Sequence, residues 1–127
     1  MKRHAEEAYP RECCGAFLGQ AGEVTLAIPL ENVYAGSQAD RFEIAPVDLI
    51  RVEREARAQG VELLGIYHSH PDCDAYFSKT DLENSCPWYL SLVLSVKLGR
   101  YDHANCFETD DERMAATPVE WAPRPAA

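Results

Sequence analysis

Residues 61–70, VELLGIYHSH, restrict the fold more than any other part of the chain. Apolar side chains occupy both alternating sets of positions, and successive side chains of a strand point to opposite faces. A strand that is apolar on both faces is typical of a central position in a sheet, and Pro71 ends it. The preceding residues 45–60 predict an amphipathic helix, because Pro46 suits a first helical turn, apolar residues recur among arginines and glutamates, and Gly60 stops the pattern.

The remaining sequence alternates between strands and short helices. Short helices are predicted at 2–9 and 78–86, and strands at 13–20, 23–32, 41–44, 88–96, 103–109 and 118–121. This pattern indicates a mixed α/β domain with one sheet and few helices. With 127 residues, 46% of them hydrophobic, the chain can bury a sizeable core, so we expect one domain over residues 1–122 and a flexible tail at 123–127.

Composition excludes several classes of partner. The chain has 12 Lys and Arg against 21 Asp and Glu, and its formal net charge of −9 would repel nucleic acid and anionic membranes. The first residues, MKRHAEEAYP, lack the apolar stretch of a signal peptide, and no segment approaches the roughly 20 apolar residues of a membrane span. We therefore expect a cytoplasmic protein. The five cysteines are an odd number, which favours buried free thiols over a disulfide framework.

Two histidines, His68 and His70, stand one residue apart at the end of the predicted central strand. Residues i and i+2 of a strand point to the same side, so the two imidazoles are expected to converge. A third metal ligand could be Asp81, at the start of the next helix. Two histidines and one carboxylate leave the fourth tetrahedral position for water, which is typical of catalytic zinc. The motif therefore predicts one zinc ion per chain.

A second interpretation of Ser78 and Asp81 needs no metal. The order Ser-x-x-Asp ahead of Leu82 is that of a helix capping box, with Ser78 as the N-cap residue. For this pair taken alone capping is favoured, because capping boxes are far commoner than metal sites. The fixed spacing of the pair from the two histidines favours the metal site instead.

The order H-x-H-x7-S-x2-D formed by His68, His70, Ser78 and Asp81 resembles the JAMM motif of the MPN+ zinc metalloproteases. That motif includes a glutamate upstream, and Glu12 in YPRECCGAFLG corresponds to it, at the start of the first strand. The segments RFEIAPVDLIRVEREARAQG and GIYHSHPD are similar to those of the short bacterial members. The resemblance implies a single curved mixed sheet flanked by helices, with an architecture similar to that of cytidine deaminases.

The resemblance also implies an activity, the hydrolysis of amide or isopeptide bonds at the C-terminus of ubiquitin-like proteins. Short members with the P-x-E-C-C-G opening are similar to enzymes that process ubiquitin-like sulfur-carrier proteins, in some cases releasing cysteine. Such a carrier, or its C-terminal adduct, is the expected partner. Zinc would be held by His68, His70 and Asp81. Glu12 would act as the general base and Ser78 would stabilise the oxyanion.

Two alternative functions stay open. One is a non-catalytic MPN scaffold, although such proteins usually lack one or more of the ligands present here. The other is a peptidase of the same chemistry that acts on a different peptide, such as a cell-wall or phage-tail peptide.

Three further features of the sequence leave their roles open. A homodimer is compatible with the sequence. Cys73, inside the motif, is expected either to be an inert loop cysteine or to reach the metal as a soft ligand. His4 and His103 lack ligand spacing and are expected at the surface.

Overall fold

The computed structural model describes residues 1–122, and the expected tail at 123–127 lies outside the described residues. The elements in chain order are α1 (Lys2–Ala8), β1 (Cys14–Gln20), β2 (Glu23–Leu30), α2 (Pro46–Ala58), β3 (Glu62–Pro71), α3 (Lys79–Glu83), β4 (Leu90–Lys97), β5 (Arg100–Thr109) and β6 (Ala116–Val119). Their order follows the sequence-based prediction, with the exception of residues 41–44.

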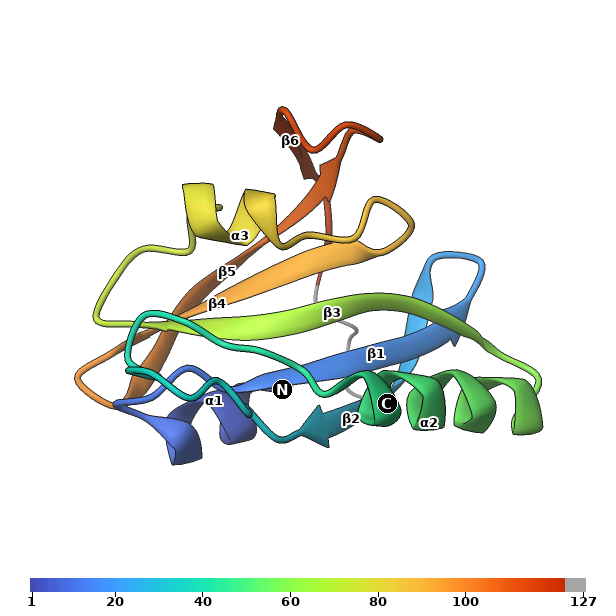
Figure 1. Cartoon of the computed structure of the whole chain (residues 1–127), viewed down its shortest axis with the longest axis horizontal. Coiled ribbons are helices and arrows are strands. Elements are labelled where there is room, and N and C mark those ends of the chain that lie inside the picture. Colours follow the sequence, from blue (N-terminus) through green and yellow to red (C-terminus); the bar gives the residue numbers. More distant parts are fainter. Residues whose placement is uncertain (123–127) are drawn as a thin grey trace.

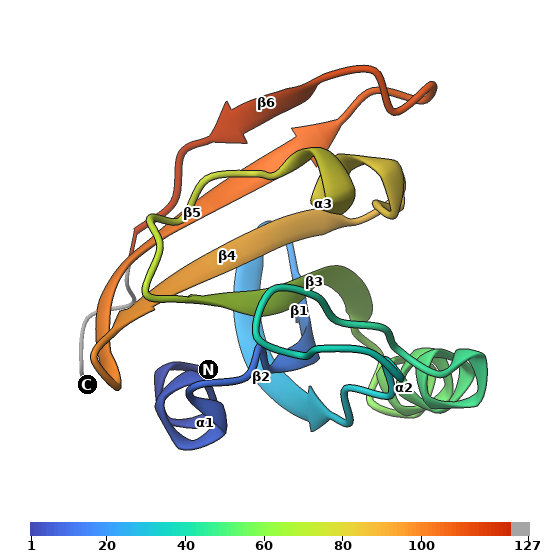
Figure 2. The same ribbon diagram turned by 60° about the vertical axis from the view of Figure 1, so that its left-hand side comes forward.

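The strands form one sheet in the order β2-β1-β3-β4-β5-β6 (Figure 1). β3 and β4 are parallel, and all other neighbouring strands are antiparallel, so the sheet is mixed as expected. β3 has a partner on each side, which confirms its predicted inner position. Figure 2 shows that the sheet is curved, with β5 and β6 turned away from β1 and β2.

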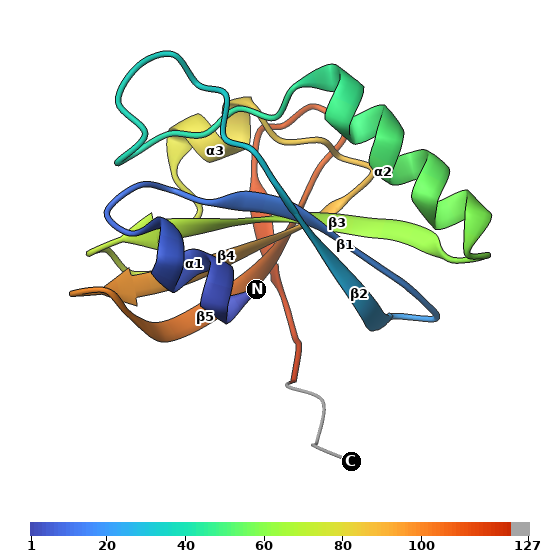
Figure 3. The same ribbon diagram turned by 90° about the horizontal axis from the view of Figure 1, so that it is seen from below.

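Helices cover both faces of the sheet. Figure 3 shows α1 on one face and α2 and α3 on the other. Ala5 of α1 packs in a core that includes Cys13, and Val52 of α2 packs in a second core that includes Cys14. The two adjacent cysteines thus point to opposite faces, and both are buried free thiols as expected. This double cover explains why the central strand is apolar at successive positions.

The helix predicted at 45–60 is present as α2, and the residues expected to begin and end it have these roles. Pro46 occupies the first turn, and Val52 and Ala56 are buried against the sheet. After the helix, Gly60 has a φ of 69°, a left-handed conformation that favours glycine. Among residues 1–122, no helix is both long enough and apolar enough to cross a membrane.

Residues 41–44 do not form the predicted strand. The N–H group of Glu43 donates a hydrogen bond of 3.1 Å to the side chain of Asn32, and its carbonyl accepts one of 2.9 Å from the N–H group of Val33. Because the backbone of Glu43 bonds to the side chain of Asn32 and to Val33, residues 41–44 do not form a hydrogen-bonded ladder with a strand. Residues 31–45 instead form a loop on the same side of the sheet as α2 and α3 (Figure 3).

Asn32 holds this loop together through every hydrogen-bonding position of its side chain. Its Nδ2 donates to the backbone oxygens of Glu12 at 3.0 Å and of Arg41 at 3.1 Å. Its Oδ1 accepts from the backbone N–H groups of Tyr34 and Glu43, each at 3.1 Å. Since an amide offers two donor hydrogens and two acceptor lone pairs, this side chain is fully used.

Asn32→Asp is expected to lower the free energy of unfolding by about 2 kcal/mol, because a carboxylate would face two backbone carbonyls that have lost their donors. Urea unfolding of the metal-free protein measures this loss. Asn84→Asp is the matched control, since Asn84 makes a single exposed hydrogen bond to the Thr80 carbonyl at 2.9 Å. The control should stay within about 0.5 kcal/mol of the parent. Equal losses in the two variants would contradict the role of Asn32.

Candidate metal centre

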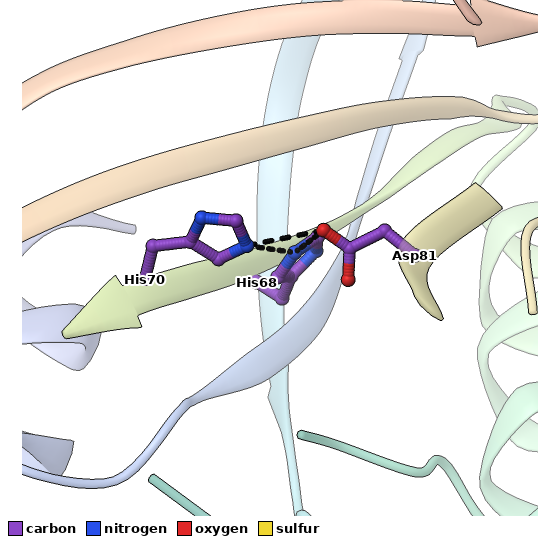
Figure 4. A group of neighbouring side chains, drawn as sticks. All are labelled: His68, His70 and Asp81. Atoms are coloured by element: carbon purple, nitrogen blue, oxygen red, sulfur yellow. Dashed lines mark hydrogen bonds and ion pairs between the residues drawn. The ribbon is translucent and has the colours of Figure 1, made fainter. Parts of the chain in front are cut away.

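Two histidines of β3 point into the same site. His68 and His70 are both buried, and their Nε2 atoms lie 3.2 Å apart, so the predicted convergence of the imidazoles is confirmed (Figure 4). Ser69, between them, faces the opposite side of the sheet. Its Oγ accepts a hydrogen bond of 2.8 Å from the N–H group of Cys13. The alternation of a strand therefore sends both imidazoles, and not the serine, to the face that carries α2 and α3.

Asp81 reaches the two histidines from the first turn of α3. Ser78 is the N-cap residue of that helix: its Oγ accepts from the N–H group of Asp81 at 3.0 Å, and its own N–H group donates to Asp81 Oδ2 at 3.1 Å. The same Oδ2 lies 3.2 Å from His68 Nε2 and 3.0 Å from His70 Nε2 (Figure 4). The capping box and the cluster thus occur together, because capping holds the carboxylate against the imidazoles.

The three donor atoms are suited to one divalent metal ion. Their separations are 3.0–3.2 Å. Three ligands of one tetrahedral zinc, each about 2.0–2.1 Å from the ion, would lie about 3.3 Å apart. Two imidazole nitrogens and one carboxylate oxygen form a donor set for a transition metal and leave one position open. An ion at this cluster would also compensate for the burial of the carboxylate.

Neighbouring groups orient both imidazoles. His70 Nδ1 lies 3.1 Å from the backbone oxygen of Asp74, which can only accept a hydrogen bond. Nδ1 of His70 therefore carries the proton, and Nε2 is directed at the cluster. His68 stacks on Phe42, with 4.6 Å between the ring centroids. Phe42 belongs to the loop 31–45, so that loop forms one wall of the site.

Burial and hydrogen bonding set the protonation of the cluster. Burial lowers the pKa of His68 and so favours the neutral imidazole, which is the form that binds a metal. Burial disfavours the Asp81 carboxylate, but hydrogen bonds with His68 and His70 outweigh it and hold the pKa of Asp81 well below its usual range. Both residues are therefore in the protonation state of a metal ligand.

Glu12 precedes the first strand and does not begin it, because β1 starts at Cys14. Cys14 pairs with His68 in the antiparallel ladder between β1 and β3. Continuing this register by two residues places Glu12 opposite His70 and on the same face of the sheet. The expected first-strand position is thus wrong by two residues, because the chain before Cys14 bonds to the loop 31–45 instead of to β2.

The Glu12 carboxyl lies in an environment that folding alone does not explain. The residue is 4% exposed, and within residues 1–122 its Oε1 has no hydrogen-bond partner. Burial, followed by the charges of Asp81 and Asp40, raises the pKa of Glu12 to about 9. A buried polar atom without a partner is costly, and such atoms are rare outside functional sites. A cation at the neighbouring cluster would lower the pKa of Glu12 and favour its carboxylate form.

A cavity of about 340 Å³ opens beside His68 and Asp81. Its walls come from the loop 31–45, from α2 and β3, and from the segment between α3 and β4. The lining includes the apolar side chains of Phe42, Ile44 and Leu49. A volume of this size is typical of a site for a small ligand or for a few residues of an extended peptide.

Three residues singled out by the sequence lie outside the cluster. His4 is partly buried on the α1 face, where its Nδ1 lies 2.8 Å from the Tyr67 hydroxyl, and burial lowers the pKa of His4. His103 is half-buried, and its Nε2 lies 2.9 Å from the backbone nitrogen of Ala75. Both histidines are expected at the surface from the sequence; each is only partly exposed, and each bonds to a group distant in sequence. Cys73 is exposed, and its role at the site stays a prediction.

Solved structures share this fold. A protein from Desulfitobacterium hafniense, solved in solution, matches with a TM-score of 0.79 and 25% sequence identity over 94% of this chain and 83% of that chain. The crystal structure of a JAB1/MPN domain protein from Archaeoglobus fulgidus matches with a TM-score of 0.58 and 18% identity over 93% of this chain and 84% of the other. The second likeness shows the fold alone.

The chain matches part of the length of several curated relatives. Desampylase of Haloferax volcanii is 36% identical over 68% of this chain and 63% of its own. A probable TtuB-protein conjugate cleaving protease of Thermus thermophilus is 32% identical over 73% of this chain and 61% of its own. Tail tip assembly protein K of Escherichia phage N15 is 32% identical over 68% of this chain and 35% of its own. The chain thus spans less than two thirds of these relatives.

The family comparison covers most of the chain. Residues 1–118 match the family described as prokaryotic homologs of the JAB domain. This range includes Glu12 and the cluster formed by His68, His70 and Asp81. The chain therefore belongs to the prokaryotic JAB-domain family.

Proposed function

We propose that this protein is a zinc-dependent metallopeptidase that hydrolyses the amide or isopeptide bond after the C-terminal glycine of a ubiquitin-like protein. The supporting observation is the convergence of His68, His70 and Asp81 beside the buried carboxyl of Glu12, whose Oε1 lacks a partner within the described chain. A non-catalytic scaffold has no use for a buried, unpaired carboxyl, and its burial costs stability. The site therefore favours an enzyme over an interaction scaffold.

Each residue of the site has a task in this reaction. His68 and His70 would hold the zinc through Nε2, and Asp81 through Oδ2. When bound, the ion supplies a Lewis acid that polarises the scissile carbonyl and lowers the pKa of the attacking water. Glu12 would accept the proton of that water and return it to the leaving amine. Burial and the nearby acidic charges raise the pKa of Glu12, and the charge of a bound cation would lower it again, so that Glu12 can bind and release a proton near neutral pH.

Ser78 would stabilise the charge that develops on the carbonyl oxygen. Its Oγ accepts a hydrogen bond from the N–H group of Asp81, which leaves the hydroxyl proton free to donate to the substrate. A donor of this kind is typically worth about 3 kcal/mol in the transition state. Since water is the nucleophile, the reaction needs no covalent intermediate with the protein.

The substrate class rests on the motif and on the comparisons. The JAMM resemblance implies a ubiquitin-like sulfur carrier or its C-terminal adduct, from which the released amine could be cysteine. One relative is named as a protease that cleaves TtuB-protein conjugates, which agrees with a conjugate as substrate. The cavity beside His68 and Asp81 has room for the extended end of such a carrier.

A second candidate substrate is an unrelated peptide. It is favoured by the likeness to a phage tail tip assembly protein, which shares 32% identity with this chain. The same residues would catalyse both reactions, so the two candidates differ in the peptide that is recognised and not in the chemistry.

Changes in the C-terminal tail of the carrier distinguish the two candidate substrates. A fusion of a ubiquitin-like sulfur carrier to a reporter peptide through Gly-Gly should be cleaved after the second glycine. Replacement of Gly-Gly by Leu-Leu should slow cleavage about 5- to 160-fold, because overpacking by bulky side chains typically costs about 1–3 kcal/mol. Cleavage rates are measured by mass spectrometry of the released reporter. A second fusion, with Leu-Leu four residues before the glycines, is the control. Equal cleavage of all three fusions would contradict the proposed substrate.

A further inference from the structure

We propose that His103 is a positioning residue for His70 and acts through the peptide unit between Asp74 and Ala75. His103 lies on β5, two strands away from His70, and does not belong to the donor cluster. The inference rests on the proposed metal site, because it assigns to His103 the orientation of one ligand of that site.

A row of three side chains crosses the sheet below the loop that follows β3. His70 pairs with Ser95 of β4, and Ser95 pairs with His103 of β5. Residues directly opposite each other in neighbouring strands present their side chains on the same face. The row therefore faces the loop, and its members hydrogen-bond to three consecutive loop residues, Cys73, Asp74 and Ala75. In this arrangement Ser95 Oγ donates to the first of them, His70 contacts the second and His103 the third.

The partners of His103 determine where its proton lies. The backbone nitrogen of Ala75, at 2.9 Å from His103 Nε2, can only donate, so Nε2 must accept. The ring proton of a neutral His103 is then on Nδ1, which lies 2.6 Å from Asp102 Oδ2. Asp102 thus holds His103 in the tautomer that can receive the Ala75 N–H group.

A single peptide unit connects His103 to His70. The carbonyl of Asp74 and the N–H group of Ala75 belong to one planar trans unit and point in opposite directions. His103 holds the N–H end at 2.9 Å, and the carbonyl end lies 3.1 Å from His70 Nδ1. Rotation of this unit would break both hydrogen bonds together. Without His103, the Asp74 carbonyl would no longer be held toward Nδ1 of His70. The His70 ring would then no longer be fixed in the tautomer and orientation that present Nε2 to the metal.

Other contacts hold the loop but not this peptide unit. Asn105 Nδ2 donates to the Ala75 carbonyl at 3.1 Å, which belongs to the next unit. Ser95 bonds to the Cys73 carbonyl, which belongs to the preceding unit. Asn105 and His103 thus lie on the same strand and bond to the same loop residue through different peptide units. Asn105→Ala is therefore a matched control for loop anchoring without peptide orientation.

The test compares His103→Leu, which removes the acceptor, with His103→Gln, whose amide oxygen can still receive the Ala75 N–H group. Zinc is titrated into each metal-free protein against a competing chelator. His103→Leu should weaken zinc binding about 10–100-fold, the usual effect of losing an outer partner of a metal ligand. His103→Gln and Asn105→Ala should stay within about threefold of the parent.

A second measurement does not depend on zinc. In the metal-free protein, nuclear magnetic resonance should show a protected His70 Nδ1–H proton in the parent and in His103→Gln, and rapid exchange of that proton in His103→Leu. Parental zinc affinity with a protected proton in His103→Leu would overturn the inference, as would an equal loss of affinity in Asn105→Ala. A parent that binds no zinc, but shows the expected pattern of proton protection, would contradict the proposed function while supporting the role of His103.

Discussion

The double variant His68→Ala/His70→Ala is expected to bind no zinc, whereas the parent binds about one ion per chain. The reason is that two of the three converging donor atoms are lost, and a lone carboxylate does not hold the ion. Metal analysis after dialysis measures the zinc content. Zinc at 100 times its dissociation constant should stabilise the parent by about 2.7 kcal/mol and leave the variant unchanged, because only the folded parent binds the ion.

Two further variants keep this result interpretable. Asp81→Asn preserves the capping box, since an amide oxygen can still accept from the N–H group of Ser78, yet it removes the charge from the ligand. It should therefore fold like the parent and bind zinc weakly. His4→Ala removes a histidine on the opposite face of the sheet and should retain the zinc. Equal zinc in the parent and the double variant would rule out the site.

Glu12→Gln is expected to lower kcat about 10²- to 10⁴-fold with zinc content unchanged, because the amide cannot accept and return a proton. Glutamine keeps the size of the side chain and does not compete for the ion, so substrate affinity should also stay near that of the parent. The measurement combines kcat, zinc stoichiometry and substrate affinity for one variant. Lost zinc would make Glu12 a ligand, and retained activity would exclude it as the base. Glu31→Gln, at an exposed position, is the matched control and should leave all three quantities unchanged.

Glu12 should also affect the stability of the metal-free protein. Burial raises its pKa from the ordinary value of 4.5 to about 9, so between these pH values the folded protein holds a proton that the unfolded chain has lost. The contribution of Glu12 to stability is therefore fully present below about pH 4.5 and is lost as pH rises through about 9. In Glu12→Gln this decrease should be absent. Urea unfolding of both metal-free proteins across this pH range makes the comparison.

The site joins a strand, a helix cap and a loop. β3 directs His68 and His70 into the site, and the capping box of α3 positions Asp81. The loop 31–45 places Phe42 against His68. Asn32 bonds both to this loop and to the backbone of Glu12, so one side chain stabilises both the cavity wall and the position of the proposed base. A substitution at Asn32 is therefore expected to disturb the geometry of the site as well as stability.

The sequence by itself determined the parts of the site that depend on local geometry. The spacing of His68 and His70 follows from the two-residue period of a strand. The contact between Ser78 and Asp81 follows from the first turn of a helix, where a side chain reaches a backbone N–H group three residues away. The inner position of β3 followed from its apolar residues at successive positions, since both of its faces are covered.

Only the tertiary structure decided which distant groups meet these residues. Glu12 faces His70 because of the register between β1 and β3, and a register is not encoded in the spacing along one strand. Residues 41–44 have the alternation of a strand, but the side chain of Asn32 binds their backbone and keeps them in a loop. His103 meets the loop after β3 because β4 and β5 align it with His70 across the sheet. Each of these outcomes depends on hydrogen bonds between segments far apart in the chain, which local sequence patterns do not specify.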